Sequence, residues 1–554
     1  MWFVSEVLTI NALSGLFGLF LQADYSTRIT LHADVEVVEN NTSTRNFEFP
    51  AAAVETINAL ARNRFPDTFR LGAASSAYQV EGAYNRSGRG LSVWDYWTHE
   101  RPSLIRDGGS GDVACDSFNK WPDDVGLVKD IEANAYRFSL SWSRILPNGL
   151  SNLVSPDGVG YYNELIDKLV LDGVAPMVTI HHFDVPHKLQ LLGGWTNPRM
   201  IDYFESYARL AFAYFGDRVK LWVTINDPWE LCNRQLGDPY RPIYNDSGIG
   251  NYLCGQHVLL AHARAYNMYR SEFQRLQRGK VGISLGARWF EPEDYTSPED
   301  AEAAELSFQF ANYWFLQPLL GEMGNYPEPV RLAVELRSAL QGYRSSRLPA
   351  LDRQQIELLK SSLDFLGLSF FTTYSVRSIA TGAPPAAYDC GSAATPGESS
   401  LEADMAATWL PYEDAFGAHE VKNTAGNFGK LLKRLSDDYI LPKIYITANG
   451  YPDFGESYDV DRAVYLYDHM GELLEAMKSG LDVRGYFVWS LMDSFEWQDG
   501  YSKRYGLFSV DFNDEGRPRR AKLSANVIRS FFKSKKLPEN FTTALRSVKG
   551  WSMD

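Results

Sequence analysis

The chain has 554 residues and a net charge of −15, with 54 Lys and Arg residues against 69 Asp and Glu residues. No run of Lys or Arg resembles a nucleic-acid or lipid-headgroup patch, so neither is expected as a partner. Hydrophobic residues at 45% and charged residues at 22% exclude a mainly disordered, collagenous or coiled-coil chain. Aromatic residues make up 14%, a supply that suits a large core or a site that stacks on sugar rings.

The first 64 residues are predicted to lie outside the compact domain. An apolar stretch, VLTINALSGLFGLFL at 7–21, makes residues 1–23 a possible signal peptide, although no basic residue precedes it. Residues 24–64 lack sustained periodicity and predict a poorly ordered leader. No second long apolar stretch follows, so no membrane span is predicted. Glycosylation sequons favour a secreted or extracellular protein; they begin at Asn40, Asn41, Asn85, Asn245 and Asn540.

The four cysteines show no metal-binding spacing. They are Cys115, Cys232, Cys254 and Cys390, without a CxxC motif or a neighbouring histidine. Cys232 and Cys254 flank a stretch rich in Gly, Pro and Asn, which they could close by a disulfide in an exported chain. Two buried thiols are the alternative. No glycine-rich phosphate loop is present either, so neither a metal nor an organic cofactor is expected.

From Phe65 onward, short apolar or β-branched runs alternate with longer helical patterns, as in βαβ units. Such runs are buried on both faces, and eight of them with intervening helices predict a single (β/α)8 TIM barrel over 65–535. A C-terminal tail, 536–554, follows. The eight predicted strands are 69–76, 135–142, 175–184, 221–227, 281–286, 365–371, 444–450 and 485–491.

Three further segments are predicted between these strands. Apolar residues at helical spacing predict outer helices over 161–173 and 200–216, each stopped by a glycine. The Pro/Gly/Ser/Ala-rich segment 379–420 predicts a long loop over the top of the barrel.

In a TIM barrel the functional residues lie where the strands end at their carboxyl side. In this chain those positions carry planar amides, an imidazole, a guanidinium, a carboxylate and indoles, a set suited to a polyhydroxylated ring. Among the residues at or just beyond the strand ends are Gln79, Arg137, His182, Asn226, Asp227, Trp489, Glu496 and Trp497.

Five long motifs in the same order resemble family-1 glycoside hydrolases, the β-glucosidase family. They are FRLGAASSAYQVEGAYN (69–85), YRFSLSWSRILP (136–147), VTINDPW (223–229), IYITANG (444–450) and GYFVWSLMDSFEWQDGYSKRYGLFSVDF (485–512). The resemblance implies retaining hydrolysis of β-glycosides, with one Glu after the fourth strand as acid/base and another after the seventh as nucleophile.

The chain departs from that family at the residues that do the chemistry. Asp227 stands in the family's Asn-Glu-Pro motif, and its shorter stem withdraws the carboxyl from the acid/base position. Ala448 stands in the family's Thr-Glu-Asn-Gly motif, and a methyl group cannot form a glycosyl ester. Phe371 replaces a Tyr that in the family donates a hydrogen bond to the nucleophile. The usual double displacement is therefore not expected.

The sugar-holding residues match the family more closely. The resemblance implies that Gln79, His182, Asn226, Glu496 and Trp497 hydrogen-bond the sugar hydroxyls and that Trp489 is the stacking platform. Arg137 matches the residue beside the nucleophile. Without that partner, we expect water, Asp227 or an anion near its charge.

Three functions follow. The first is a pseudoenzyme that binds a β-glycoside or glycan, as in the klotho-like branch of the family. The second is a weakly active glycosidase that uses Asp227 as acid and an external or substrate anion as nucleophile. The third is a scaffold with a vestigial pocket. An experimenter can also introduce alanine at position 448, but three departures together favour natural loss.

Overall fold

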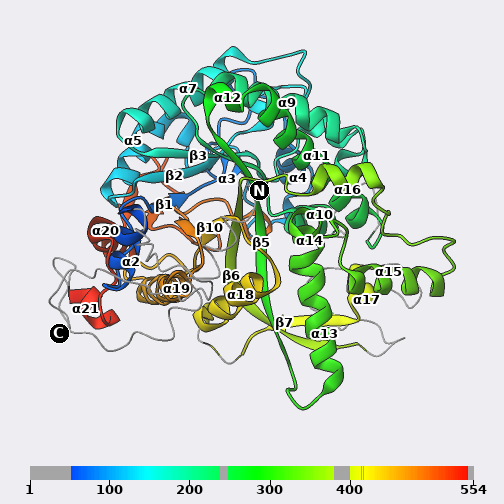
Figure 1. The fold of residues 1–554 in the computed structure, drawn as a ribbon. Helices are drawn as coiled ribbons and strands as arrows, with labels where there is room; N and C mark the ends of the chain where they lie inside the picture. Colours follow the sequence, from blue (N-terminus) through cyan, green and yellow to red (C-terminus); the bar gives the residue numbers. More distant parts are fainter. Residues whose placement is uncertain are drawn as a thin grey trace, which may run out of the picture.

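The computed structural model describes residues 51–237, 247–379 and 400–546, apart from positions 414, 416 and 419. In this part of the chain, eight parallel strands close into a barrel surrounded by helices (Figure 1). The strand order is β10-β11-β1-β2-β3-β4-β5-β6, and pairing of β6 with β10 closes the ring. The predicted (β/α)8 barrel is confirmed. Its strands are β1 (Arg70–Ala74), β2 (Ala135–Ser139), β3 (Ala175–His181), β4 (Leu221–Asn226), β5 (Lys280–Pro292), β6 (Phe365–Ser378), β10 (Lys443–Asn449) and β11 (Val483–Trp489).

The described helices follow the strands in the alternation that the sequence predicts. The longer ones are α2 (Ala51–Leu60), α4 (Val93–Glu100), α5 (Ser117–Asp130), α7 (Pro156–Leu171), α9 (Met200–Phe215), α10 (Pro228–Gly237), α11 (Gly250–Glu272), α13 (Pro298–Phe308), α14 (Trp314–Leu320), α15 (Glu328–Leu340), α16 (Arg353–Leu359), α18 (Ala425–Asp438), α19 (Val460–Lys478) and α20 (Leu523–Ser534). Short helices are α3 (Ala77–Val80), α6 (Trp142–Ile145), α8 (His187–Gln190), α12 (Gln274–Gln277), α17 (Leu401–Met405), α21 (Phe541–Arg546), η1 (Pro102–Leu104), η2 (Gly194–Thr196), η3 (Gln309–Tyr313) and η4 (Trp497–Asp499). The minor strands are β7 (Ala407–Pro411), β8 (Gly417–Ala418), β9 (Val421–Lys422), β12 (Phe508–Val510) and β13 (Arg519–Ala521).

Helix α7 begins five residues earlier than its hydrophobic pattern predicts. Ser155 caps it, because its hydroxyl accepts a hydrogen bond from the backbone N–H of Gly158 at 3.1 Å. Pro156 then occupies the first helical turn, where its missing N–H is harmless. Helix α9 ends at Phe215, and Gly216 caps it near the predicted stop. A local capping residue therefore sets the start of α7.

Side chains fill the inside of the barrel. Because side chains alternate along a strand, one set faces the helices and the other faces the barrel axis. The axial set forms its own buried cluster, which includes both candidate positions 448 and 489. Its members are Ala74, Ala135, Met177, Val223, Phe365, Ala448, Phe487 and Trp489.

The ordered body extends beyond the predicted limits of 65 and 535. Residues 51–60, predicted as part of a poorly ordered leader, form α2, which lies beside α19 (Figure 1). Leu537, predicted as part of the tail, is buried, and its backbone N–H donates to Asn63 O at 3.1 Å. The chain just after α2 thus pairs with the chain around Leu537. This pairing and the contact of α2 with α19 extend the ordered body beyond both predicted limits. Residues 1–50, including the possible signal peptide, lie outside the described residues.

The outer part of the barrel rim is more regular than predicted. Strands β5 and β6 continue past the predicted 286 and 371, and their pairing reaches Pro292 and Val376. Strand β7 then pairs antiparallel with the outer half of β6. The predicted loop 379–420 thus contains α17 and β7, while 380–399 lies outside the described residues. Within the described residues, no helix combines the length and the hydropathy that a bilayer crossing requires.

Candidate active site

Arg137 lies on β2 inside the barrel and is 1% exposed. Its Nε donates to Thr179 Oγ1 at 3.1 Å, and its Nη1 donates to the carbonyl oxygen of Thr447 at 2.9 Å. Its Nη2 donates to Asn226 Oδ1 at 2.5 Å. All three partners are uncharged, and burial lowers the pKa of Arg137 to about 9. Asp227, expected as one possible partner, forms its ion pair elsewhere.

The bond from Arg137 also fixes His182. Because Asn226 Oδ1 accepts from the guanidinium, the amide nitrogen of Asn226 is left to donate to His182 Nε2, 3.2 Å away. Burial, then the charge of Arg137 and the neighbouring His181, hold the pKa of His182 well below its usual range. The imidazole is therefore neutral with its proton on Nδ1, which has no partner among the described residues. Arg137, Asn226 and His182 form one polar chain across β2, β4 and the end of β3.

Ala448 is 4% exposed and lies at the penultimate position of β10. Its methyl group belongs to the axial cluster with Trp489. The carbonyl oxygen of the preceding residue, Thr447, accepts a hydrogen bond from Arg137, which therefore lies close to position 448. No carboxylate is supplied at this position by the sequence, and the methyl group has no catalytic chemistry.

Phe371 is half-buried on β6, with its ring edge directed at Tyr505 at a centroid distance of 6.1 Å. Its backbone carbonyl accepts a hydrogen bond from the hydroxyl of Tyr465 at 2.7 Å. The side chain itself packs beside the axial cluster that contains Ala448. Two apolar side chains, Phe371 and Ala448, thus lie in the region where the resemblance places a tyrosine donor and its carboxylate acceptor.

Asp227 follows β4 directly and caps α10. Its Oδ1 accepts a hydrogen bond from the backbone N–H of Glu230 at 3.0 Å, and its own backbone N–H donates to Ser284 O at 2.7 Å. This side-chain hydrogen bond is the one that an N-cap aspartate makes, although the backbone of Asp227 has φ 33° and not the extended conformation usual at a cap. One oxygen of the carboxyl is therefore committed to the helix.

The second oxygen of Asp227 lies against β5. A Cβ atom built on Gly286 would come within 1.9 Å of this Oδ2, so only glycine leaves room for the carboxyl. Arg288 Nη2 lies 3.5 Å from the same oxygen and 3.2 Å from Glu230 Oε2. The guanidinium also sits 4.3 Å from the ring centre of Trp229. Sequence reasoning missed Arg288, because the outward extension of β5 was not predicted.

Gln79 and Glu496 meet on the other side of the mouth. Gln79 is fully buried, and its amide nitrogen donates to Phe495 O at 2.8 Å while Ser76 Oγ donates to its Oε1 at 2.6 Å. Ser494 Oγ donates to Glu496 Oε1 at 2.7 Å. Burial raises the pKa of Glu496 to about 8, partly offset by hydrogen bonds from Ser494 and Gln79. This carboxyl group is largely neutral at pH 7.

The two candidate indoles flank His182. Trp489 and Trp497 have ring centres 5.7 Å and 6.1 Å from the imidazole, with interplanar angles of 27° and 20°. Trp497 is half-buried and also stacks on Tyr78. The structure therefore brings the predicted sugar-binding residues into two linked groups, one around Arg137 and His182 and one around Gln79 and Glu496.

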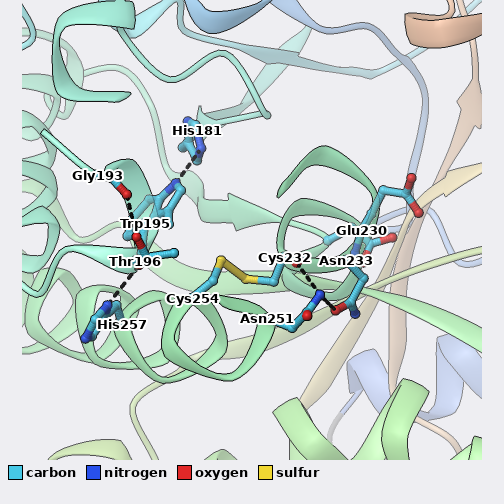
Figure 2. Close-up of a disulfide and its surroundings, with 11 residues drawn as sticks. His181, Gly193, Trp195, Thr196, Glu230, Cys232, Asn233, Asn251, Cys254 and His257 are labelled. Carbon is cyan, nitrogen blue, oxygen red and sulfur yellow. Dashed lines mark hydrogen bonds between the residues drawn. A yellow bond between two sulfur atoms is a disulfide. The ribbon is translucent and has the colours of Figure 1, made fainter. Parts of the chain in front are cut away.

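Helix α10, which starts at the Asp227 cap, is fastened to α11 by the predicted disulfide. Figure 2 shows the bond between Cys232 and Cys254, which is confirmed. Beside it, the amide nitrogen of Asn251 donates to Cys232 O at 3.0 Å and to Asn233 Oδ1 at 2.9 Å. Helix α10 is thus held at its start by the Asp227 cap and further along by the disulfide to α11. Cys115 is a buried thiol, and Cys390 lies outside the described residues. Within those residues, no group of three or more metal-ligating side chains occurs.

Known proteins resemble the chain over most of its length. The sequence profile of glycosyl hydrolase family 1 matches residues 61–537. Myrosinase 1 of Brevicoryne brassicae is 39% identical over 461 residues, covering 82% of this chain and 96% of that protein. The lactase-like protein of Homo sapiens is 37% identical over 495 residues, covering 88% and 84% respectively.

Solved structures agree with this assignment. A β-glucosidase of the fungus Humicola insolens in complex with glucose has a TM-score of 0.76 and 33% identity, covering 85% of this chain and 98% of that one. The family-profile match over residues 61–537 includes all eight barrel strands and every candidate residue of the site. The chain belongs to glycosyl hydrolase family 1.

Proposed function

We propose that this family member does not hydrolyse glycosides but binds a β-glycoside or glycan at the mouth of the barrel. The observation that carries the proposal is Ala448, a methyl group where the family resemblance places the nucleophile, next to retained sugar-binding residues. Retaining hydrolysis needs two carboxyl groups about 5–5.5 Å apart, one on each side of the glycosidic bond. The chain offers no carboxyl at 448 to form that pair.

The binding half of the proposal rests on the retained polar and aromatic groups. His182 presents a buried Nδ1–H donor, Glu496 a buried carboxyl, and Trp489 an indole face. A hydroxyl-rich ring satisfies donors and acceptors while its apolar face covers an indole. Buried polar groups without a partner are costly, which supports a ligand that supplies one.

The geometry of Asp227 disfavours the alternative of a weakly active enzyme. A general acid has to reach the leaving oxygen in the Michaelis complex. Both oxygens of Asp227 are engaged, one with the N–H of Glu230 and one beside Arg288. Freeing the side chain would cost the helix cap and the ion pair together.

The test is turnover and binding of an aryl β-glucoside, measured with purified protein with and without sodium azide. Saturable binding without turnover is the expected result. Turnover at an ordinary rate without azide would overturn the proposal, because another group would then act as nucleophile. Turnover only with azide would favour the anion-assisted alternative, and absence of any binding would favour the scaffold.

Restoring the family residues provides the matched comparison. Ala448→Glu alone supplies a nucleophile but leaves Asp227 on its cap, so little activity is expected. The triple change Ala448→Glu, Asp227→Glu and Phe371→Tyr restores both carboxyls and the tyrosine donor. Activity that appears only in the triple variant supports an intact binding site in the parent protein.

We also propose that the chain is exported. The Cys232–Cys254 disulfide supports an oxidising compartment, and the sequon residues Asn85 and Asn540 are exposed. Expression in secreting cells, followed by enzymatic removal of N-glycans, tests this. The expected results are recovery from the medium and a drop in mass after glycan removal. Retention inside the cells without glycans would contradict it.

A further inference from the structure

Arg137 differs from the other buried arginines of the described chain. Four others are buried, and each has a carboxylate partner: Arg89 with Asp95, Arg144 with Glu81, Arg347 with Asp404, and Arg462 with Asp459. Arg137 is as deeply buried as these, yet no described carboxylate forms an ion pair with it. A buried cation without a counter-charge is costly in a low-dielectric interior. The site is therefore electrostatically incomplete.

The guanidinium also has donors to spare. It carries five N–H groups, and three hydrogen bonds to Thr179, Thr447 and Asn226 leave two N–H groups for a further acceptor. These bonds fix the orientation of the guanidinium plane before any ligand arrives. A planar fork of this kind suits an acceptor with two oxygens, such as a carboxylate.

The residues around Arg137 are buried but not completely covered. Ala448, which follows the Thr447 carbonyl bonded to Arg137, and Asn226 retain 4% and 7% of their surface exposed. Trp489, in the same cluster as Ala448, retains 6%. Each of these residues therefore keeps a small solvent-accessible part close to Arg137. An anion beside Arg137 would meet a methyl group, an amide and a guanidinium, while the carboxylate of the neighbouring Asp227 is paired with Arg288.

We propose that Arg137, together with Asn226 and Ala448, forms a binding site for a carboxylate-type monoanion inside the barrel. The bound anion supplies Arg137 with the negative charge that an Asp or Glu side chain supplies to each of the other buried arginines. The carboxylate is either a free small ion or a group carried by a larger ligand. Anion binding at this site does not require glycoside binding. The proposal can therefore be tested separately from the proposed function.

The experiment measures the thermal unfolding midpoint and the tryptophan fluorescence of the full chain at increasing concentrations of sodium formate. Formate replaces the salt of a bulky sulfonate, so that the ionic strength stays constant. A saturable rise in the unfolding midpoint is expected, because formate binds only the folded state. A fluorescence change with the same midpoint concentration is expected from Trp489, which packs with Ala448. A midpoint that does not respond to formate overturns the proposal.

Variants at the site identify its position. Ala448→Glu places a carboxylate within the protein, so the response to formate should disappear and the midpoint in formate-free buffer should rise. Ala448→Gln fills the same space without charge and should not raise that midpoint. Arg137→Met should abolish the response, whereas Arg344→Met, at an exposed arginine, should retain it. If Arg137→Met fails to fold, the two Ala448 variants still decide, and a full response in Ala448→Glu overturns the proposal.

A second pair of titrations separates the two sources of the carboxylate. An aryl β-glucuronide that competes with formate indicates a site that accepts a ligand carboxylate. An aryl β-glucoside that binds equally with and without formate, while the glucuronide does not compete, indicates a site for a free ion. A formate response without any glucoside binding would support the anion site and contradict the proposed function. Glucoside binding without a formate response would support the proposed function and contradict the anion site.

Discussion

Asp227 Oδ1 accepts the hydrogen bond that the backbone N–H of Glu230 donates, so the carboxyl at the end of β4 stabilises the helix that follows it. The family places its acid/base residue at this position. In this chain the shorter side chain turns back onto its own helix and is held there by Arg288. Both oxygens of the Asp227 carboxyl are therefore held close to the start of α10.

Removal of this cap should reduce stability. Asp227→Ala is expected to lower the free energy of unfolding by about 1 kcal/mol, the usual loss for an N-cap. Urea denaturation measures it. Asp352→Ala is the matched control, because Asp352 caps α16 by accepting from the N–H of Gln355 at 2.8 Å. The loss in Asp227→Ala should be at least as large as in Asp352→Ala, because it also removes the ion pair with Arg288, and an unchanged Asp227→Ala protein would show that the cap contributes nothing.

The wall that confines Asp227 can be tested through glycine. Gly286→Ala is expected to destabilise the protein by more than about 1 kcal/mol, because its Cβ would lie 1.9 Å from Asp227 Oδ2. Gly471→Ala in α19 is the control, since a Cβ there meets no atom within 4 Å and alanine favours helix. That variant should be slightly more stable than the parent. Denaturation midpoints compare the two, and a tolerated Gly286→Ala would mean that the carboxyl moves freely.

Glu496 should make stability depend on pH. Its pKa rises by burial from 4.5 to about 8, so between these values the folded state holds a proton that the unfolded state has lost. The free energy of unfolding should then fall as pH rises through this window, by up to about 1.4 kcal/mol per pH unit. Glu496→Gln cannot ionise and should flatten this part of the profile. Urea unfolding at a series of pH values measures the difference, and parallel profiles would contradict the assignment.

The disulfide should contribute to stability through the loop that it closes. Cys232 and Cys254 are separated by 22 positions, for which loop-closure entropy predicts about 3 kcal/mol. Replacement of both by alanine should lower the free energy of unfolding by about that amount. Reducing agent should destabilise the parent and leave the double variant unchanged. An effect of reducing agent on the double variant would point to another thiol, such as Cys115.

The barrel could be predicted from the sequence because its strands are short apolar runs between helices of clear periodicity. The cluster of Arg137, Asn226 and His182 was also predictable, since strand ends of a closed parallel barrel meet at one rim. The orientation of Asp227 was not, because it depends on Gly286 and Arg288, which are distant in sequence and lie beyond the predicted end of β5. Helix α2 was missed for a similar reason: its ordering depends on contact with α19 and on the pairing of Asn63 with Leu537.

Arg137 also has a bearing on how such a protein can arise. From its place on β2, the guanidinium reaches Thr179 on β3, Asn226 on β4 and Thr447 on β10. These hydrogen bonds link four of the eight barrel strands without any contribution from residue 448. The barrel therefore does not need a carboxylate at position 448 in order to fold. A substitution at that position can remove catalysis in a lineage and leave the fold available for another function.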